Sequence, residues 1–328
     1  MKAVFFNEYG SPDNLHLKEV AKPIPDDDEV LIKVQASSIN SWDWEFLSGT
    51  PFINRLMFGL FKPKAGKQIL GADVAGTVEV VGARVKKFHV GDRVFGDLWD
   101  QWGGFAEFAC AKETALELMP KNSSFEEAAA VPQAGVLALQ GFLKAEKLEP
   151  GAKVLINGAG GGVGTFAIQL VKLSGAEVTG VDARHKLDIV RSVGADHVVD
   201  YQQVDYTNTG EQYDLIIDCQ SDRSISDYKR ALRPHGTYAM IGGSSVLPKM
   251  LQSVCSRFTG ETRKFFVVMD GPNKGLDYLR ELIENRRIVP VIDKTFQLCD
   301  VPKAMRYFEQ GLHKGKIVIS MENKRTQE

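Results

Sequence analysis

A glycine-rich turn between a short strand and a helix is the feature of this chain most typical of chemistry. The segment 153–182 opens with an apolar strand, crosses a glycine cluster, continues in a helical pattern and closes on a second strand that ends at Asp182. Its small residues follow the spacing Ala159-x-Gly161-x-x-Gly164. This order of strand, turn, helix, strand and acid is the context of a dinucleotide-binding fingerprint.

Each small residue in this turn has a physical reason. Ala159 stands in place of the first glycine and is still small enough for a tight turn, Gly161 lets the backbone approach a pyrophosphate, and Gly164 lets the helix pack close to the strand. The helix N-terminus offers free N–H groups and a partial positive charge to phosphates. The residues expected to contact a dinucleotide here are Ala159, Gly161, Gly162, Val163 and Gly164.

The elements after the turn predict a sheet that holds it. Strands and helices keep alternating as far as residue 269, which is typical of a parallel sheet covered on both faces. Six strands would complete one doubly wound Rossmann domain. We expect strands at 197–200, 214–218, 237–241 and 265–269, and helices at 185–193 and 225–232.

The first 120 residues have a different pattern, in which short alternating runs such as 30–35 are separated by glycines. This pattern favours an irregular antiparallel β-barrel. A helical segment, 124–148, would follow, with a break at Pro132. Helices at 275–287 and 301–311 and strands within 288–296 and at 316–320 would return to the first domain. The predicted fold is α/β, with domains at 1–124, 125–269 and 270–328.

Composition narrows the class of protein. The chain has 328 residues, 25% of them charged, and a net charge of −2. Binding to nucleic acid or to an anionic membrane is typical of chains with excess positive charge, which this chain lacks. No apolar run is long enough to span a bilayer. The cysteines are far apart and form no C-x-x-C pair, so we expect reduced thiols and a cytoplasmic protein.

Several motifs together carry a family resemblance. The segments GADVAGTVEVVG, VGDRVFG, GGFAEFA, EEAAAVPQAG, NGAGGGVG and HKGKIVI occur in that order. The chain resembles the medium-chain dehydrogenase/reductase superfamily, and is most similar to its zinc-independent quinone oxidoreductase branch. The resemblance implies a GroES-like catalytic domain, a Rossmann domain, an active site in the cleft between them, and a homodimer. The apolar stretch 237–241 is compatible with sheet pairing between two subunits.

The positions of the superfamily's catalytic zinc ligands are altered here. Asn40 stands where its alcohol dehydrogenases have a cysteine, and Ala72 stands where they have a histidine. A catalytic zinc needs about three protein ligands, so we expect no metal. The resemblance places Asn40 at the nicotinamide ribose or the substrate oxygen, although it could instead fix its own loop. Asp43 could relay a proton, orient Asn40 or cap the loop, and Asp73 is expected to brace the backbone.

Without a metal to stabilise an alkoxide, the site favours acceptors that spread the incoming negative charge themselves. Quinones and α,β-unsaturated carbonyls do so, and modest hydrogen-bond donors then suffice. The chain is thus predicted to reduce a hydrophobic quinone or enone by direct hydride transfer. The alternatives are a zinc-free alcohol or carbonyl dehydrogenase, and a non-enzymatic NADPH-binding redox sensor.

Other contacts follow from the resemblance. The apolar segment 51–67 would border the substrate, with Trp42, Phe52 and Phe58 in the pocket, although a core helix or a partner surface is an equal alternative. Leu137 replaces a threonine that touches the nicotinamide amide in relatives, and Gln133 could compensate. Two glycines after the fifth strand should pass near the nicotinamide half, namely Gly242 and Gly243.

The choice of nicotinamide cofactor depends on the residues after the second Rossmann strand. Asp182 would accept hydrogen bonds from a ribose hydroxyl and repel a 2′-phosphate, which favours NADH. Arg184 follows at once, and Lys186 and Tyr201 match positions that hold the 2′-phosphate in NADPH-using relatives. Two cations could balance a phosphate, so the resemblance favours NADPH over NADH.

Overall fold

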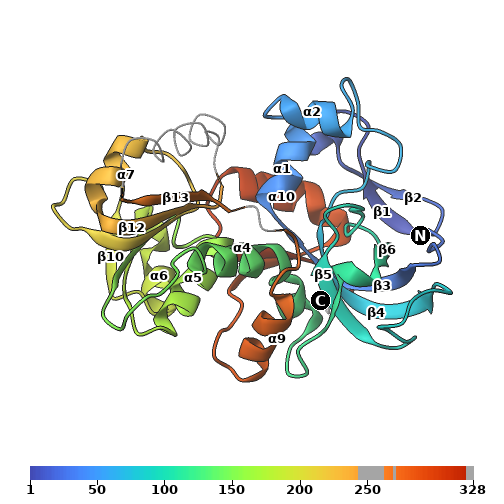
Figure 1. Cartoon of the computed structure of the whole chain (residues 1–328). Helices are drawn as coiled ribbons and strands as arrows, with labels where there is room; N and C mark the ends of the chain where they lie inside the picture. The colour runs from blue at the N-terminus through green and yellow to red at the C-terminus, as the bar shows by residue number, and fades with distance from the viewer. Residues whose placement is uncertain (243–261, 269–270, 323–328) are drawn as a thin grey trace, which may run out of the picture. The chain divides into compact units, whose positions relative to one another are not determined.

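The computed structural model describes residues 1–242, 262–268 and 271–322, and divides into two compact units (Figure 1). The first unit comprises Met1–Gln133, Pro272–Asn285 and Pro290–Glu328, and the second comprises Ala134–Gly271 and Arg286–Val289. The expected positions Gly243 and Met269 lie outside the described residues. No described helix has the length and apolar character needed to cross a membrane.

The second unit is a parallel six-stranded sheet with the strand order β10-β9-β8-β11-β12-β13. Counted from β8, this is the 3-2-1-4-5-6 order of a doubly wound dinucleotide-binding fold, so the predicted Rossmann domain is confirmed. The strands are β8 (Lys153–Asn157), β9 (Glu177–Asp182), β10 (His197–Asp200), β11 (Tyr213–Asp218), β12 (Leu232–Met240) and β13 (Lys264–Val267).

Helices alternate with these strands along the chain, and α5 packs on β8 and β9 directly after the glycine turn. The helix expected at 185–193 is a 3-10 turn, η3, followed by a short α-helix, α6. The break expected at Pro132 is present, because α3 ends before it and α4 begins on it. The helical elements of this unit are α4 (Pro132–Phe142), α5 (Gly162–Lys172), η3 (Arg184–Lys186), α6 (Leu187–Ser192) and α7 (Ile225–Ala231), whereas α3 (Phe125–Ala129) packs on the strands of the first unit.

Strand β12 corrects two expectations. It begins five residues earlier than position 237, because the pairing with β11 shifts from Tyr213↔Leu232 to Leu215↔Thr237 and the extra residues, Pro234 among them, form a bulge. A bulge tolerates a proline because no ladder N–H is needed there. β12 also pairs on both sides, with β11 and β13. It therefore has no open edge for the sheet pairing between subunits that stretch 237–241 suggested.

The first unit is built around the long strand β3 (Glu29–Ile39). Its seven-stranded sheet has the order β14-β15-β3-β4-β5-β7, with β6 also paired to β3. The C-terminal strand β15 pairs antiparallel with the end of β3, so that Ile317 lies opposite Ile39. The remaining strands of this sheet are β4 (Asp73–Val81), β5 (Arg93–Asp97), β6 (Phe108–Lys112), β7 (Glu117–Leu118), β14 (Ile292–Gln297) and β15 (Lys316–Ser320).

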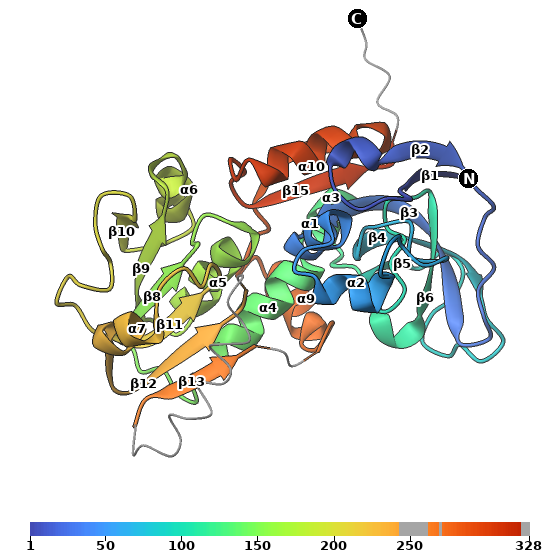
Figure 2. The same cartoon turned by 90° about the horizontal axis from the view of Figure 1, so that it is seen from above.

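In the described part of the chain, α3, four further α-helices and a small two-stranded sheet complete this unit, and Figure 2 shows α10 beside β15. The C-terminal helices are shorter at their ends than expected, and strand β14 starts at Ile292 rather than near position 288. The elements are β1 (Lys2–Phe5), β2 (His16–Glu19), α1 (Ser41–Ser48), α2 (Ile53–Phe58), α9 (Leu276–Glu284) and α10 (Val301–Glu309).

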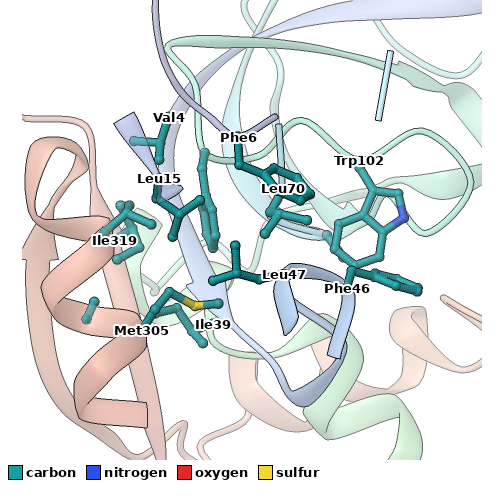
Figure 3. Close-up of a cluster of buried hydrophobic side chains, with 14 of the residues drawn as sticks. Val4, Phe6, Leu15, Ile39, Phe46, Leu47, Leu70, Trp102, Met305 and Ile319 are labelled. Carbon is teal, nitrogen blue, oxygen red and sulfur yellow. The ribbon is translucent and has the colours of Figure 1, made fainter. Parts of the chain in front are cut away.

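A buried aromatic and aliphatic cluster fixes α1 where β3 ends (Figure 3). Phe46 of α1 lies 3.6 Å from Phe58 and 4.6 Å from Trp102, measured between ring centroids. Ile39 at the end of β3 and Met305 of α10 belong to the same cluster. Truncating a buried aromatic of this kind costs about 3–5 kcal/mol, so the cluster holds residues 40–43 firmly in place.

Candidate active site

Asn40 occupies the single residue between β3 and α1, and its backbone is held by Asp43. The Asn40 N–H donates to Asp43 Oδ2 at 2.8 Å, and the Gly71 N–H donates to Asp43 Oδ1 at 2.8 Å. Asp43 is fully buried. Burial raises the pKa of the Asp43 carboxyl to about 7, although the two backbone N–H bonds oppose the rise. In the structure Asp43 therefore orients the Asn40 loop.

Asp73, the first residue of β4, gathers polar groups from distant parts of the chain. Its Oδ1 accepts the Gln133 N–H at 2.9 Å. Its Oδ2 accepts from Ser38 Oγ at 2.7 Å and from Asn40 Nδ2 at 2.8 Å. Lys316 Nζ completes this set at 3.2 Å from the same oxygen. We expected Asp73 to brace the backbone, and its hydrogen bond to the Gln133 N–H does so. Its other hydrogen bonds are to side chains.

Lys316 is a buried lysine that sequence reasoning missed. It is 3% exposed and begins β15, beside the end of β3. Its ammonium donates to the Ile39 carbonyl at 3.2 Å, to Asp73 Oδ2 and, by a short bond, to Asn40 Oδ1. An ammonium has three N–H donors, and each has an acceptor. The signal available in the sequence was a charged residue at the start of an otherwise apolar strand.

The network fixes how the Asn40 side chain is used. Its Oδ1 accepts from Lys316, and one of its two Nδ2 hydrogens goes to Asp73. Among the described residues, the second Nδ2 hydrogen has no acceptor. Asn40 is 6% exposed. The Asn40 side chain is thus arranged to donate.

Asp97 is a second buried acid that sequence reasoning missed. It lies on β5 directly opposite Asp73 on β4. Burial raises its pKa to about 8, with the charges of Asp73 and Asp43 adding to the rise, while Gln133 and Lys316 act against it. Its Oδ1 is buried with no hydrogen-bond partner among the described residues. The raised pKa favours the protonated form of this carboxyl, and the ion pair beside it is Lys316–Asp73.

The glycine turn of the second unit is folded as a dinucleotide cradle requires. The N–H groups of Gly158 and Ala159 both donate to the Val181 carbonyl at 3.0 Å. A Cβ on Gly164 would lie 2.2 Å from the Gly158 oxygen, so only glycine fits where the helix meets the turn. A Cβ on Gly161 would meet nothing nearer than 3.5 Å. That open approach at the start of α5 suits a pyrophosphate.

The acid at the end of β9 is part of this cradle. Asp182 is buried, and its two oxygens accept the N–H groups of Gly160 at 2.7 Å and Ala183 at 2.8 Å. Among the described residues no ion pair joins Asp182 and Arg184, and Arg184 is exposed. Lys186 is buried against Gly160, since a Cβ there would lie 2.7 Å from Lys186 Cβ.

Two further positions expected at the cofactor are resolved. Tyr201 follows β10 and is 41% exposed, and its backbone N–H donates to the Asp182 carbonyl at 3.4 Å. The Gly242 carbonyl accepts from Ser221 Oγ at 2.5 Å. The turn, the helix start and the acid thus fit a nicotinamide dinucleotide, and the residues that would hold it are 158–164, Asp182 and Lys186.

The aromatic residues expected around the substrate have different surroundings. Trp42 is half-buried, with its ring centroid 4.6 Å from that of Trp99. Phe52 is 61% exposed. Phe58 is 7% exposed and packs against Phe46 in the core cluster, with the two rings tilted. Phe58 is therefore a packing residue of the first unit, because the aromatic cluster offers it a dry partner on α1.

No set of three His, Cys, Asp or Glu side chains in the described part of the chain is arranged to hold a metal ion. The groups near Asp73 are poor zinc ligands: the amide of Asn40, the methyl group of Ala72 and the ammonium of Lys316. The positive charge of the ammonium also repels a cation such as Zn²⁺.

Comparison with known proteins agrees with this architecture. The family model of the alcohol dehydrogenase GroES-like domain matches residues 26–141, and that of the zinc-binding dehydrogenase matches residues 193–319. The chain is 34% identical to quinone-oxidoreductase QR1, chloroplastic, of Triphysaria versicolor, over 97% of this chain and 98% of that protein. It is 32% identical to 2-methylene-furan-3-one reductase of Solanum lycopersicum, over 97% and 79%.

A solved structure is similar over its whole length. The quinone oxidoreductase from Coxiella burnetii matches with a TM-score of 0.87 and 28% identity, covering 98% of this chain and 99% of that one. The GroES-like and Rossmann units expected from the sequence are both present in this likeness. The chain belongs to the medium-chain dehydrogenase/reductase superfamily, in its quinone-oxidoreductase-like branch.

Proposed function

We propose that this protein is an NAD(P)H-dependent oxidoreductase that reduces a quinone or an α,β-unsaturated carbonyl by direct hydride transfer, without a catalytic zinc. The names of its relatives, a quinone oxidoreductase and a methylene-furanone reductase, support both acceptor classes. The observation that carries the proposal is the Asn40 amide. Its oxygen is bound to Lys316, and it keeps an N–H for a ligand.

The chemistry asks little more of the protein. The bound nicotinamide supplies the hydride. When a hydride adds to an enone or a quinone, negative charge gathers on the acceptor's oxygen, and a preorganised N–H donor stabilises that charge. Asn40 is the residue we assign to this role, with Asp43 holding its backbone. Burial also raises the pKa of the Asp97 carboxyl, opposite Asp73 on the neighbouring strand, which lessens the negative charge beside the network.

For the cofactor we propose NADPH. Asp182 already accepts two backbone N–H bonds, which spread its charge and reduce its repulsion of a 2′-phosphate. Lys186 lies beside Gly160 in the cradle, and Arg184 is exposed on the same turn. We assign Gln133 and Gly242 to the nicotinamide half, and Trp42 and Phe52 to the acceptor.

The assembly and the compartment are part of the proposal. We propose a homodimer, in which any sheet pairing between subunits uses β13, the strand beside β12 at the sheet margin of the described residues. We retain the cytoplasm as the predicted compartment on the spacing of the cysteines. No membrane or nucleic-acid partner is included.

One assay tests the function. Oxidation of NADPH and NADH is followed with 1,4-quinones, enones and simple aldehydes, and reduction of NADP⁺ and NAD⁺ is followed with simple alcohols, each before and after exhaustive chelation. The proposal expects turnover of quinones or enones that survives the chelator, with Asn40→Ala lowering kcat about 100-fold and exposed Lys294→Met as the matched control. Turnover of simple alcohols alone would instead make it a dehydrogenase, and cofactor binding without turnover would make it a sensor.

A further inference from the structure

Lys316 is an unusual residue for its position. The strand that it begins, KIVIS, is buried at all five residues, and lysine is almost never fully buried unless it is paired. Bringing an ammonium out of water costs several kcal/mol, and the cost is offset only when its charge and all its donors find partners. Here Asp73 balances the charge, and the Ile39 carbonyl and Asn40 Oδ1 take the other two donors.

Charge balance alone does not explain this arrangement. Asp73 also accepts from Ser38, Asn40 and the Gln133 backbone. Its carboxylate would therefore remain hydrogen-bonded without the lysine. Among the described residues, Lys316 is the side chain that donates to the amide oxygen of Asn40.

That donor decides which way the Asn40 amide faces. A side-chain amide can turn by 180°, which exchanges its acceptor oxygen and its donor nitrogen. An ammonium can only donate and a carboxylate can only accept. In the observed orientation the oxygen meets Lys316 and the nitrogen meets Asp73. In the turned orientation the amide nitrogen would face the Lys316 ammonium and the amide oxygen would face the Asp73 carboxylate. Both hydrogen bonds would then be lost.

We propose that Lys316 is a positioning residue that, with Asp73, fixes Asn40 so that it offers an N–H, and not a carbonyl oxygen, to the acceptor. The inference rests on the proposed function and sharpens its substrate class. A fixed N–H favours acceptors whose oxygen becomes negative as the hydride arrives. It disfavours the oxidation of an alcohol, whose hydroxyl proton needs an acceptor that this amide does not present.

A double-mutant cycle tests this role. The kcat and KM for an enone or quinone are measured for the parent, Lys316→Met, Asn40→Ala and the double variant. Lys294→Met, an exposed lysine on the neighbouring strand β14, is the matched control. We expect Lys316→Met to lower kcat about 10-fold or more with KM little changed, because the N–H acts on the developing charge. The double variant should resemble Asn40→Ala within about 2-fold.

Since Lys316→Met leaves the Asp73 charge uncompensated and could unfold the chain, a neutral pair, Lys316→Met with Asp73→Asn, is tested alongside it. If Lys316 only balances charge, this pair recovers the parent's kcat, and the inference is wrong. If the pair folds and its kcat stays low, the inference holds. Additive losses of kcat in the cycle would also overturn it.

A second readout does not depend on turnover. In protein labelled with ¹⁵N at asparagine, the Asn40 Nδ2 hydrogens are assigned by their loss in Asn40→Ala. The parent should show slow exchange of these hydrogens with solvent, and the neutral pair should show exchange at least about 10-fold faster because the local opening cost is lost. Equal exchange rates would refute the positioning role. A parent that shows slow exchange but reduces no acceptor would refute only the proposed function.

Discussion

Two buried aspartates, one in each unit, are held in opposite ways. Asp182 accepts two backbone N–H groups, from Gly160 in the glycine turn and from the next residue, Ala183. Asp73 accepts from side chains on β3 and β15, from Asn40, and from the backbone where α4 begins. Asp182 and the residues that hold it lie within one contiguous sequence motif, which can be recognised from the sequence alone. A carboxylate held by distant side chains exists only when the whole unit has folded.

Of the variants considered, Asp73→Asn should lower the free energy of unfolding most, because it disrupts the network of distant side chains around Asp73. It leaves the Lys316 ammonium buried without its counter-charge, a change that costs about 3–5 kcal/mol. Urea unfolding of the parent and the variant measures this loss. The neutral pair with Lys316→Met should recover much of it, and no recovery would mean that the two charges are not coupled.

Gly164→Ala should disrupt the glycine turn that holds Asp182 through a steric clash. The added methyl group would lie 2.2 Å from the Gly158 oxygen, and forcing it in costs about 1–3 kcal/mol. Gly161→Ala is the control, since its methyl group meets nothing within 3.4 Å. We expect Gly161→Ala to keep the parent's melting temperature and to weaken NADPH binding in a fluorescence titration. Equal melting of all three proteins would contradict the close contact at Gly164.

Asp182→Ser should change which nicotinamide cofactor the protein prefers, which tests the role of the carboxylate in the second unit. The shorter side chain gives up the carboxylate that holds the Gly160 and Ala183 N–H groups, a loss of about 1–3 kcal/mol if they stay buried. It also removes a negative charge near a 2′-phosphate. The ratio of kcat/KM for NADPH to that for NADH should therefore rise. An unchanged ratio would show that this carboxylate does not read the ribose.

Asp97→Asn should have the smallest effect at neutral pH, and its consequence is seen as a pH dependence of stability. The pKa of Asp97 is raised in the folded state to about 8 from an ordinary value of 3.8. Between these two values the folded protein binds the extra proton, so the free energy of unfolding falls as the pH rises. The variant should lose less stability than the parent between about pH 5 and pH 8. Parallel curves would mean that Asp97 is ionised in the folded protein.

The same contrast explains what the sequence could predict. The Rossmann order, the glycine turn and Asp182 follow from contiguous motifs with a fixed geometry, and the structure has them. Lys316 and Asp97 were missed because their roles arise only when β15 pairs with β3 and β5 pairs with β4. The start of β12 was wrong because a bulge admitted Pro234 into a strand. Phe58 was assigned to a pocket because an apolar segment does not reveal which of its side chains is packed.

The most direct test follows a label from cofactor to product. Metal-free protein is mixed with NADPH carrying deuterium at the transferred position of C4 and with an enone, and the product is examined by NMR. The account predicts deuterium on the carbon β to the carbonyl in the absence of any added metal, with a much slower reaction in Asn40→Ala. Reduction that begins only after zinc is restored, or deuterium on the carbonyl carbon, would contradict it.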